Sequence, residues 1–530
     1  MQADTPSIYE LLQALLPAPP KLRQQHWLSE QRYPTGRWGS GLRSFSQVIF
    51  INHPLSGALL LLAFLLQSPW MAFLAVVGMA AANTVSRLLN LGQILRHQGI
   101  HGFNGVLVGC AGAVLLESSS PSDAALIAVA VALGGGVTTL LIELWRRRFH
   151  RRGDPPALTL PFCLVTWGLV MLLSPRIPDP IETLQPAVFI RSVQAIVLGL
   201  PHSFGQVFLC SDLASGWLVL LAVAVASPIA AGLGVFGALI GMLTALAIGT
   251  DPSAVAQGLW GYNGVLVAIA LGGIFHAPGR RSLVIALTGA ALASLLQTLQ
   301  VRWMDSLPPL TLSFVLTTWL MQRLVGRALP ALIPVALHAV VTPEEHRQRF
   351  LVASELLGAF RRNLRQRIEG ADPNAGMDQA HPRPDGQIQD LFEQLDRNGD
   401  GNLSLDELRH ALVGDHTNDH TERKRTSSLN DQLAATMASL DLDGDGQINS
   451  VEFSLLIQRL QRLREGEERL LLYLMPVDGD GNDRLDQDEL ARLLQSIGQP
   501  PLTSKEQSLV FINEKQSLSW HDFVDRLLLS

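Results

Sequence analysis

The sequence predicts an all-α protein in two parts: a polytopic membrane domain built from two inverted five-helix repeats with re-entrant half-helices, and an α-helical soluble domain after it. Two observations lead to this fold class. The 530-residue chain is mostly Leu, Ala, Val and Gly from about residue 47 to 341, and is rich in Arg, Asp, Glu and Gln from Thr342 onward. A segment at 101–109 recurs almost unchanged at 260–268, an offset of 159. The apolar part is therefore a duplication.

The composition divides the chain into four segments. We expect a cytoplasmic lead-in at 1–40, the membrane domain at 41–341 with repeats of about 41–200 and 201–341, a basic helix and linker at 342–387, and the soluble domain at 388–530. The lead-in has no continuous apolar core, so no secretory signal is predicted.

Apolar runs of the right length and polarity predict membrane-spanning helices. These runs are 55–66, 71–85, 124–145, 217–248 and 283–299. The segments around Gly105 and Gly264 are shorter and are interrupted by Gly and Asn. Such segments suit discontinuous helices that line a cavity, where a transported molecule would bind.

Basic residues set the expected orientation. Residues 146–152 hold five arginines, Arg280 and Arg281 follow a later span, and the loops at 117–123 and 250–257 carry no Lys or Arg. Basic loops remain cytoplasmic, so about ten spans place both termini inside a plasma (inner) membrane, with five spans in each half. The halves then run in opposite directions, as in an inverted repeat.

Several functional classes lack support. Few ionisable side chains interrupt the apolar runs, so a neutral cargo is favoured over an ion. A Gly-x-Gly-x-x-Gly spacing ends at Gly237, four residues before Gly241, inside an apolar run, which favours close helix packing over dinucleotide binding. The three cysteines read as buried packing residues, and the net charge of −6 comes largely from the soluble tail. We expect no enzyme activity and no nucleic-acid partner.

Two polar positions near helix ends are interpreted as structural. Glu143 lies one turn before the arginine cluster and is expected to pair with it at the interface. His53 and Asp212 occupy equivalent repeat positions near a mouth, and a structural role is favoured over a proton relay for the histidine.

Three motifs occur in the apolar part of the chain. They are Gln47 followed by Pro-Leu-Ser-Gly at 54–57, the twin Gly-aromatic-Asn-Gly-Val-Leu segments, and two copies of Leu-Pro-x-x-Thr-x-Pro-Phe at 155–162 and 307–314. Together they resemble the motifs of the urea transporter family. The resemblance covers roughly 43–325. The motif copies depart from the family pattern at Pro155, which replaces Leu, and at Ser313, which replaces Pro.

The resemblance implies a channel-like homotrimer in the lipid bilayer, with one pore for passive urea passage in each subunit and, in each half, five spans and one tilted half-helix. By motif position, Gln47 and Gln206 would stand at the two mouths and Thr159 and Thr311 at the constriction. The flat apolar walls would be Phe50, Phe103, Leu107, Val207, Tyr262 and Leu266. Some family members carry Glu at the position of Gln206. Because this chain has Gln there, this mouth is uncharged.

Physical chemistry favours the same cargo. Urea is planar and neutral, so a slot between aromatic faces with oxygen atoms along its rim can replace its hydration, whereas an ion loses too much hydration free energy there. Hydrogen bonds of about 1 kcal/mol net each allow both entry and exit. The alternative is that Thr and Gln here only join helices.

The soluble tail contains two loops that match the EF-hand pattern at every ligand position. Oxygen ligands at loop positions 1, 3, 5, 7, 9 and 12 suit calcium, and Gly401 and Gly446 allow the sharp turn at position 6. The predicted ligands are Asp396, Asn398, Asp400, Asn402, Ser404 and Glu407 in the first loop, and Asp441, Asp443, Asp445, Gln447, Asn449 and Glu452 in the second.

Two further loops are less regular. The third would use Asp478, Asp480, Asn482, Arg484 through its carbonyl, Asp486 and Glu489. It has Asp483 where Gly is expected, which predicts weaker binding. A fourth loop at 511–522 aligns through Leu518 but has Phe, Asn and Lys at its early ligand positions, so we expect it only to pair structurally. Two pairs of hands make a calmodulin-like domain.

A basic amphipathic segment at 346–367 joins the two domains. It reads as a membrane-surface helix or as an intramolecular ligand of the EF-hands. In the second case, calcium would open the hands, and their capture of this helix would regulate the pore. Two alternatives remain for the whole chain: a membrane-anchored calcium sensor or buffer, and a channel for another small neutral amide or ammonia.

Overall fold

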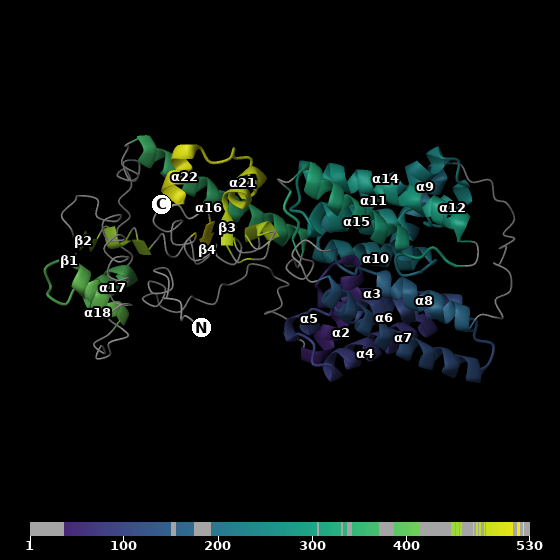
Figure 1. Cartoon of the computed structure of the whole chain (residues 1–530). Coiled ribbons are helices and arrows are strands. Elements are labelled where there is room, and N and C mark those ends of the chain that lie inside the picture. The colour runs from purple at the N-terminus through teal and green to yellow at the C-terminus, as the bar shows by residue number, and fades with distance from the viewer. Residues whose placement is uncertain are drawn as a thin grey trace. The chain divides into compact units, whose positions relative to one another are not determined.

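The computed structural model describes residues 36–149, 155–173, 192–304, 307–329, 332–335, 342–369, 386–413 and, with gaps, 447–523 (Figure 1). Contacts divide the chain into two units at Gln348. We call the described residues up to Gln348 the N-terminal unit and those from Arg349 the C-terminal unit, and describe each by itself.

All the regular elements that the structure describes in the N-terminal unit are helices. Its first half contains α2 (Gly36–Ser46), the 3-10 helix η1 (Gln47–Ile49), α3 (Pro54–Gln67), α4 (Pro69–Leu88), α5 (Gln93–His97), α6 (Phe103–Leu115), α7 (Pro121–Arg148) and α8 (Leu160–Leu173). Its second half contains α9 (Ser192–Gln206), α10 (Leu213–Ala226), α11 (Pro228–Ala247), α12 (Pro252–Ala256), α13 (Tyr262–Ile269), the π-helix η2 (Ala270–Ile274), α14 (Arg280–Trp303) and α15 (Leu312–Ala328).

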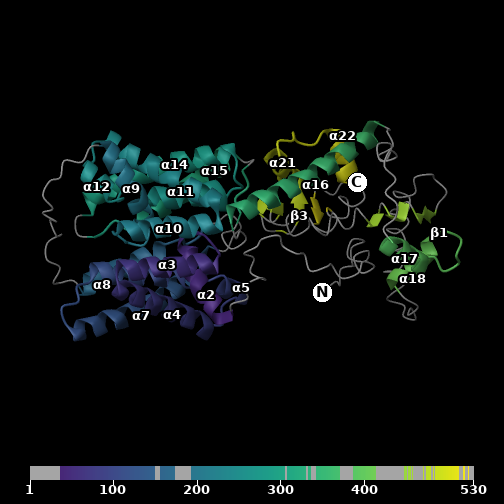
Figure 2. The same cartoon turned by 180° about the vertical axis from the view of Figure 1, so that it is seen from behind.

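The duplication in the sequence is also present in the helices. Helices α4 and α11 both have 20 residues and begin 159 positions apart, at Pro69 and Pro228. Helices α5 and α12 keep the same offset and length. In Figures 1 and 2, helices α2–α8 form one group and α9–α15 another, and α3 packs against α10 where the groups meet.

One apolar run contains a break that its hydropathy does not reveal. Residues 217–248 belong to two helices, α10 and α11, because the chain is extended at Ser227, whose side chain caps Ala230 N. Pro228 begins α11, and proline is tolerated in the first turn of a helix but not in its interior. The pair His53 and Asp212 likewise cap α3 and α10, which confirms a structural role for the histidine.

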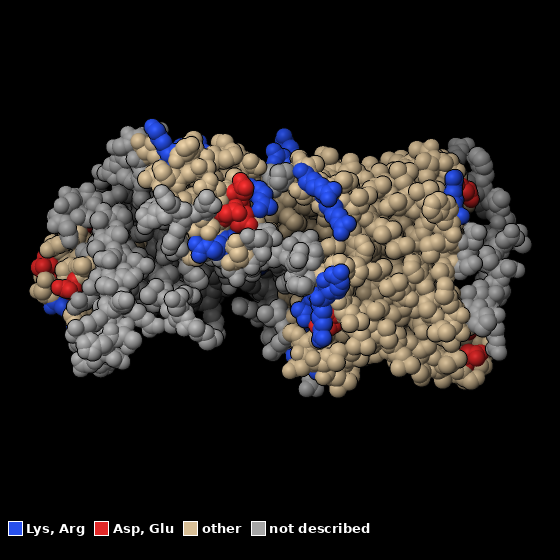
Figure 3. Space-filling view, viewed as in Figure 1, with Lys and Arg blue, Asp and Glu red and all other residues tan. Residues whose placement is uncertain are grey.

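The surface of the N-terminal unit suits lipid. Four described helices are long and apolar enough to span a membrane, namely α4, α7, α11 and α14, and the bent pair Gly39–Ile49 with Pro54–Gln67 makes a fifth candidate. Figure 3 shows a broad side of this unit without Lys, Arg, Asp or Glu, with the charged side chains at its margins. Glu143, only 6% exposed, pairs with Arg146 and Arg147 at the end of α7, as predicted.

The C-terminal unit combines helices with two short sheets. Its elements are α16 (Pro343–Glu369), which begins in the N-terminal unit, then α17 (Gly386–Leu395), β1 (Asn402–Leu403), α18 (Leu405–Val413), β2 (Ile448–Asn449), β3 (Arg484–Asp486), α21 (Gln487–Ser496), α22 (Ser504–Val510) and β4 (Ser517–Ser519). Strands β1 and β2 pair antiparallel, and so do β3 and β4. Each sheet therefore joins two consecutive EF-hand-like loops.

Candidate functional site

The two halves of the N-terminal unit bind each other through reciprocal hydrogen bonds. Ser56 Oγ donates to the carbonyl of Ala222 at 2.7 Å, and Ser215 Oγ donates to the carbonyl of Ala63 at 2.9 Å. Ser56 and Ser215 are equivalent in the repeat, as are Ala63 and Ala222. Such reciprocity is the signature of a twofold relation between two surfaces.

A second reciprocal pair lies beside the two Thr-containing motifs. Trp167 Nε1 donates to the carbonyl of Pro308, and Trp319 Nε1 donates to the carbonyl of Pro156, both at 2.9 Å. The offset between the equivalent residues is 152 in both cases. The local twofold axis therefore passes between the two motif loops.

The predicted constriction residues meet at this axis. Thr159 Oγ1 and Thr311 Oγ1 share a hydrogen bond of 2.7 Å, and the two residues are 1% and 3% exposed. The residues before them, Leu158 and Leu310, have φ of 50° and 46°. This left-handed conformation is unfavourable for a branched residue, so packing must enforce it at both positions. The strained turns place two hydroxyl groups at the centre of the unit.

The predicted mouth glutamines begin equivalent turns. Phe50 N donates to Gln47 O, and Leu209 N donates to Gln206 O. Phe50 and Leu209 are again left-handed, with φ of 61° and 59°. Among the described residues, neither glutamine side chain has a hydrogen-bond partner. Both amides therefore keep their hydrogen-bonding capacity for another molecule.

The predicted wall residues are buried on both sides of the axis. Phe103, Leu107, Val207, Tyr262 and Leu266 are each at most 6% exposed. The ring centroid of Phe50 lies 5.8 Å from that of Phe314 and 6.4 Å from that of Phe275, both in the other half.

Paired glycines bring α6 and α13 close to their neighbours, α4 and α11. A Cβ atom on Gly78 would lie 2.1 Å from the carbonyl oxygen of Gly105, and one on Gly237 would lie 2.2 Å from that of Gly264. A Cβ atom on Gly241 would lie 2.6 Å from the carbonyl oxygen of Trp260. Close packing thus explains the glycine spacing in α11, as the sequence indicated.

Sequence reasoning missed two asparagines that position the motif loops. Asn104 Nδ2 donates to the carbonyl of Leu158, and Asn104 Oδ1 accepts from Phe162 N, both at 3.2 Å. The equivalent Asn263 donates to Leu310 O at 3.5 Å and to Gln297 Oε1 at 2.8 Å. Both asparagines are fully buried. Their recurrence in the twin segments was the available signal.

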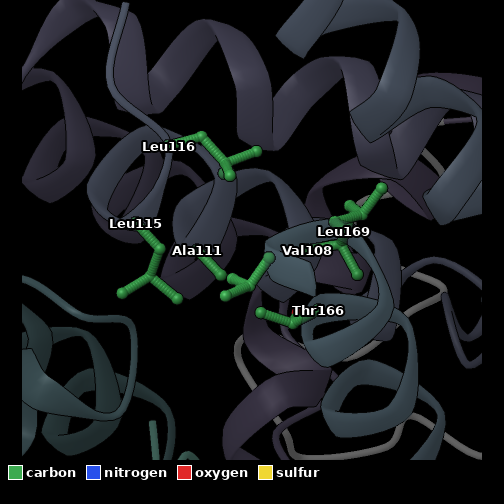
Figure 4. Close-up of a pocket in the computed structure, with 8 residues that line it drawn as sticks. Val108, Ala111, Leu115, Leu116, Thr166 and Leu169 are labelled. Carbon is green, nitrogen blue, oxygen red and sulfur yellow. The ribbon is translucent and has the colours of Figure 1, made fainter. Parts of the chain in front are cut away.

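A small apolar pocket lies away from these residues, between α6 and α8. Figure 4 shows Val108, Ala111, Leu115 and Leu116 on one side and Thr166 and Leu169 on the other. None of the predicted pore residues lines it.

The first acidic loop of the C-terminal unit has the expected backbone. Gly401 has φ of 84°, the left-handed conformation that position 6 requires, and Leu403 pairs with Ile448 of the second loop. Asp396 accepts from Gly399 N at 2.7 Å and from Gly401 N at 2.9 Å.

Glu407 closes the same loop. It accepts hydrogen bonds from Arg397 N, Asn398 N and Ser404 N. Burial alone would raise the pKa of Glu407, but the hydrogen bonds, those from Ser404 above all, hold it below its usual value. Among the described residues, no group of three His, Cys, Asp or Glu side chains is placed to hold a metal ion. The donor set is nevertheless all hard oxygen, which fits calcium.

The remaining predicted ligands are partly described. Asp441, Asp443, Asp445 and Asp480 lie outside the described residues. The others lie in the loops that β2 and β3 complete; they are Gln447, Asn449 and Glu452 in the second, and Asp478, Asn482, Arg484, Asp486 and Glu489 in the third. Of the first-loop ligands, Asn402 pairs with Asn449.

The fourth loop pairs with the third, as the sequence predicted. Leu485 lies opposite Leu518 in the β3–β4 ladder. The guanidinium of Arg484, at position 7 of the third loop, donates to Ser517 Oγ and Ser517 O, both at 2.8 Å. The third and fourth loops are therefore joined by direct hydrogen bonds between their own residues.

Fold and site together define a duplicated multi-pass membrane transport protein fused to an EF-hand region. Residues 39–326, more than half of the chain, match the family model of the urea transporter, and residues 386–458 match that of an EF-hand domain pair. The chain belongs to the urea transporter family.

Relatives match both parts. Urea transporter 1 of Ovis aries is 29% identical over 327 residues, 59% of this chain and 83% of that protein. Urea transporter 1 of Mus musculus is 28% identical over 330 residues, 58% of this chain and 82% of that protein. The tail is similar to a probable calcium-binding protein, CML17, of Oryza sativa subsp. japonica, at 29% identity over 123 residues, 21% of this chain and 70% of that protein.

Proposed function

We propose that this chain conducts urea passively through a narrow path at the local twofold axis. The hydrogen bond between Thr159 and Thr311 is the observation that carries this proposal. A planar solute with N–H donors and a carbonyl acceptor replaces that single bond by bonds to both hydroxyls. The exchange is nearly balanced, because one net hydrogen bond contributes only about 1 kcal/mol, and balance is what rapid passage requires.

The glutamines complete the path. Gln47 and Gln206 offer a carbonyl oxygen and an amide at each mouth, while the aromatic rings of Phe50, Phe103 and Tyr262 cover the flat faces of the solute. An uncharged path of this kind rejects ions, because nothing in it compensates their lost hydration.

The test is urea-driven shrinkage of proteoliposomes measured by stopped-flow light scattering. Thr159→Val with Thr311→Val removes both hydroxyls at nearly constant volume and should abolish most of the urea flux. Thr84→Val is the matched control, because Thr84 is exposed and its hydroxyl bonds only to its own helix. Flux that survives the double substitution would place the path elsewhere. Parallel assays with formamide, acetamide and ammonia identify the preferred cargo.

Charge supports an inverted arrangement of the halves. Helix α7 ends in Arg146–Arg148, whereas the equivalent α14 begins with Arg280 and Arg281. Because basic residues remain on the cytoplasmic side, these equivalent helices run in opposite directions. We propose a cytoplasmic location for both termini, in the inner membrane, and the homotrimer that the family resemblance implies. The cysteine of Arg148→Cys should react with a membrane-impermeant thiol reagent only when the reagent is on the cytoplasmic side. Native mass spectrometry of the parent should show assemblies of three chains.

We also propose that calcium binding to the hands regulates flux, acting through α16. The start of this helix is bonded within the N-terminal unit: Glu344 Oε1 accepts from Ile229 N at 2.7 Å, and His346 Nδ1 lies 2.9 Å from Gly273 O. Glu344 thereby places a carboxylate at the N-terminus of α11, a favourable site for negative charge.

A calcium titration on the tail side of proteoliposomes tests this regulation. Urea flux should change between chelator and calcium in the parent, and should not change when Asp396 and Asp441 are both replaced by Asn. If parent flux is constant across the titration, the hands are a membrane-anchored sensor or buffer instead.

A further inference from the structure

Helix α16 buries one complete side within the C-terminal unit. Ala353, Leu357, Phe360 and Leu364, spaced three or four residues apart, are each at most 5% exposed. The Phe360 ring packs edge-on against that of Phe523, with centroids 5.6 Å apart. This stripe is the pattern of an amphipathic helix seated in a groove.

A second ring contact extends the seat toward the start of the unit. Phe350 packs edge-on against Tyr473, again with centroids 5.6 Å apart. From Phe350 to Leu364 the seat thus covers about four turns of α16.

A buried arginine lies within the same seat. Arg361 is 2% exposed, and its guanidinium donates to the carbonyls of Pro500 and Pro501 and, at 3.2 Å, to Glu506 Oε2. Glu506 is also 2% exposed and receives a further bond from Arg365 at 3.3 Å. A charge is buried at this depth only when it is paired and hydrogen-bonded.

Glu506 belongs to the second hand pair, by which we mean the third and fourth loops with α21 and α22. It completes the capping box of α22, where Thr503 N donates to Glu506 Oε2 at 2.6 Å. The groups that hold Arg361 are thus fixed by the local fold of α22 and by the Pro500–Pro501 turn. Neither element supplies a calcium ligand.

The two loops of this pair are also joined by a side-chain hydrogen bond that needs no metal ion. The Arg484 side chain reaches across to Ser517, and the fourth loop has Phe511 at the first ligand position. The first hand pair, comprising the loops at 396–407 and 441–452, has oxygen donors at every ligand position instead.

We propose that the second hand pair holds α16 as a standing ligand, with or without calcium, and that the first hand pair alone receives the calcium signal. This inference rests on the calcium regulation proposed above and assigns its parts. The seat of the second pair fits a basic amphipathic helix with one arginine inside its apolar stripe. The chain itself supplies that helix.

Hydrogen exchange of the full chain in lipid nanodiscs tests the proposal. Amides of 353–364 should exchange slowly and at the same rate in chelator and in calcium, whereas amides of 396–407 should slow only with calcium. Arg361→Gln and, separately, Glu506→Gln should speed exchange at 353–364 at least tenfold, and glutamine retains the capping ability of residue 506. Arg362→Gln, the same change one residue along at an exposed position, should have no effect.

Each outcome is decisive. The proposal is overturned if amides of 353–364 exchange slowly only with calcium. It is also overturned if Arg361→Gln and Arg362→Gln give equal exchange rates there. If Arg361→Gln also speeds exchange of the β3–β4 amides, α16 is part of the core of the second hand pair. That outcome supports the proposal that this pair holds α16 with or without calcium. Urea flux of the same purified protein is measured separately in proteoliposomes, and its absence in the parent would refute the transport proposal without touching the exchange result.

Discussion

The chain contains two duplications, and they have diverged in different ways. The halves of the N-terminal unit keep the same residue types at their reciprocal contacts, with Thr159 bonded to Thr311 across the axis. The two hand pairs do not: one has a full set of oxygen donors, and the other uses its arginine and glutamate for contacts within the protein. A site on a twofold axis needs both copies, whereas each hand is a site by itself, so one pair is free to take another role.

The largest expected effect comes from adding a Cβ atom to the glycines at which helices within each half touch. Gly237→Ala drives a Cβ atom into the Gly264 carbonyl, which should cost roughly 3 kcal/mol or more of folding free energy. Gly232→Ala in the same helix meets no atom within 4 Å and should stabilise by about 0.5–1 kcal/mol. Melting temperatures in detergent compare the two variants.

If the halves are equivalent, Gly78→Ala must behave like Gly237→Ala, since its Cβ would meet the Gly105 carbonyl. A melting temperature for Gly78→Ala near that of the parent would break the comparison.

Calcium affinity should separate the hand pairs. Glu407→Gln removes the carboxylate that closes the first loop and should weaken binding at that site at least about tenfold, equivalent to 1.4 kcal/mol. Glu489→Gln in the third loop should leave the stronger sites unchanged. Isothermal titration of the full chain in micelles resolves both, and equal losses would contradict the division of roles.

The asparagines should show a smaller asymmetry between the halves. Asn104→Ala leaves Leu158 O and Phe162 N unpaired and should cost about 1–3 kcal/mol per buried group. Asn263→Ala should disturb its motif loop less, because its contact with Leu310 O is longer, at 3.5 Å, and its closer bond, at 2.8 Å, is to Gln297 outside that loop. Urea permeability and unfolding temperature are measured together, with Asn104→Asp as the partner variant that keeps the acceptor oxygen. A larger loss for Asn263→Ala would reverse this ranking.

The smallest expected effect is a loss of folding stability at acid pH, where protonation of Glu506 weakens its contacts with α16. Burial opposes ionisation of Glu506, but hydrogen bonds from Thr503 and the charges of Arg361 and Arg365 outweigh it and lower its pKa below the usual 4.5. A carboxylate whose folded-state pKa is lowered stabilises the fold above its unfolded value, and that stability is lost as pH falls through the folded pKa. Thermal melts from pH 6 to pH 3.5 should show this loss in the parent and not in Glu506→Gln; parallel curves would refute it.

Much of the fold was visible in the sequence because its signals are local or repeated. The offset of 159 returned as equal helix lengths in α4 and α11. The glycine spacing in α11 predicted close packing, and Leu518 predicted the partner of the third loop. The break at Ser227 was missed because hydropathy does not register an extended residue before a proline.

The site was less predictable, because its geometry arises from contacts between distant segments. Thr159 and Thr311 were identified by motif, but no local pattern shows that they touch. Asn104 and Asn263 were overlooked because their partners lie near Leu158 and Leu310, about 50 residues away.

The sequence by itself determined the duplication, the apolar and acidic halves of the chain, and the loops able to offer oxygen ligands, since composition, period and spacing are properties of the chain alone. Only the tertiary structure decided which duplicated residues meet at the axis, and that Arg361 lies in a buried seat rather than on a surface. Burial and pairing depend on what the rest of the fold places opposite a side chain, and that is set by packing.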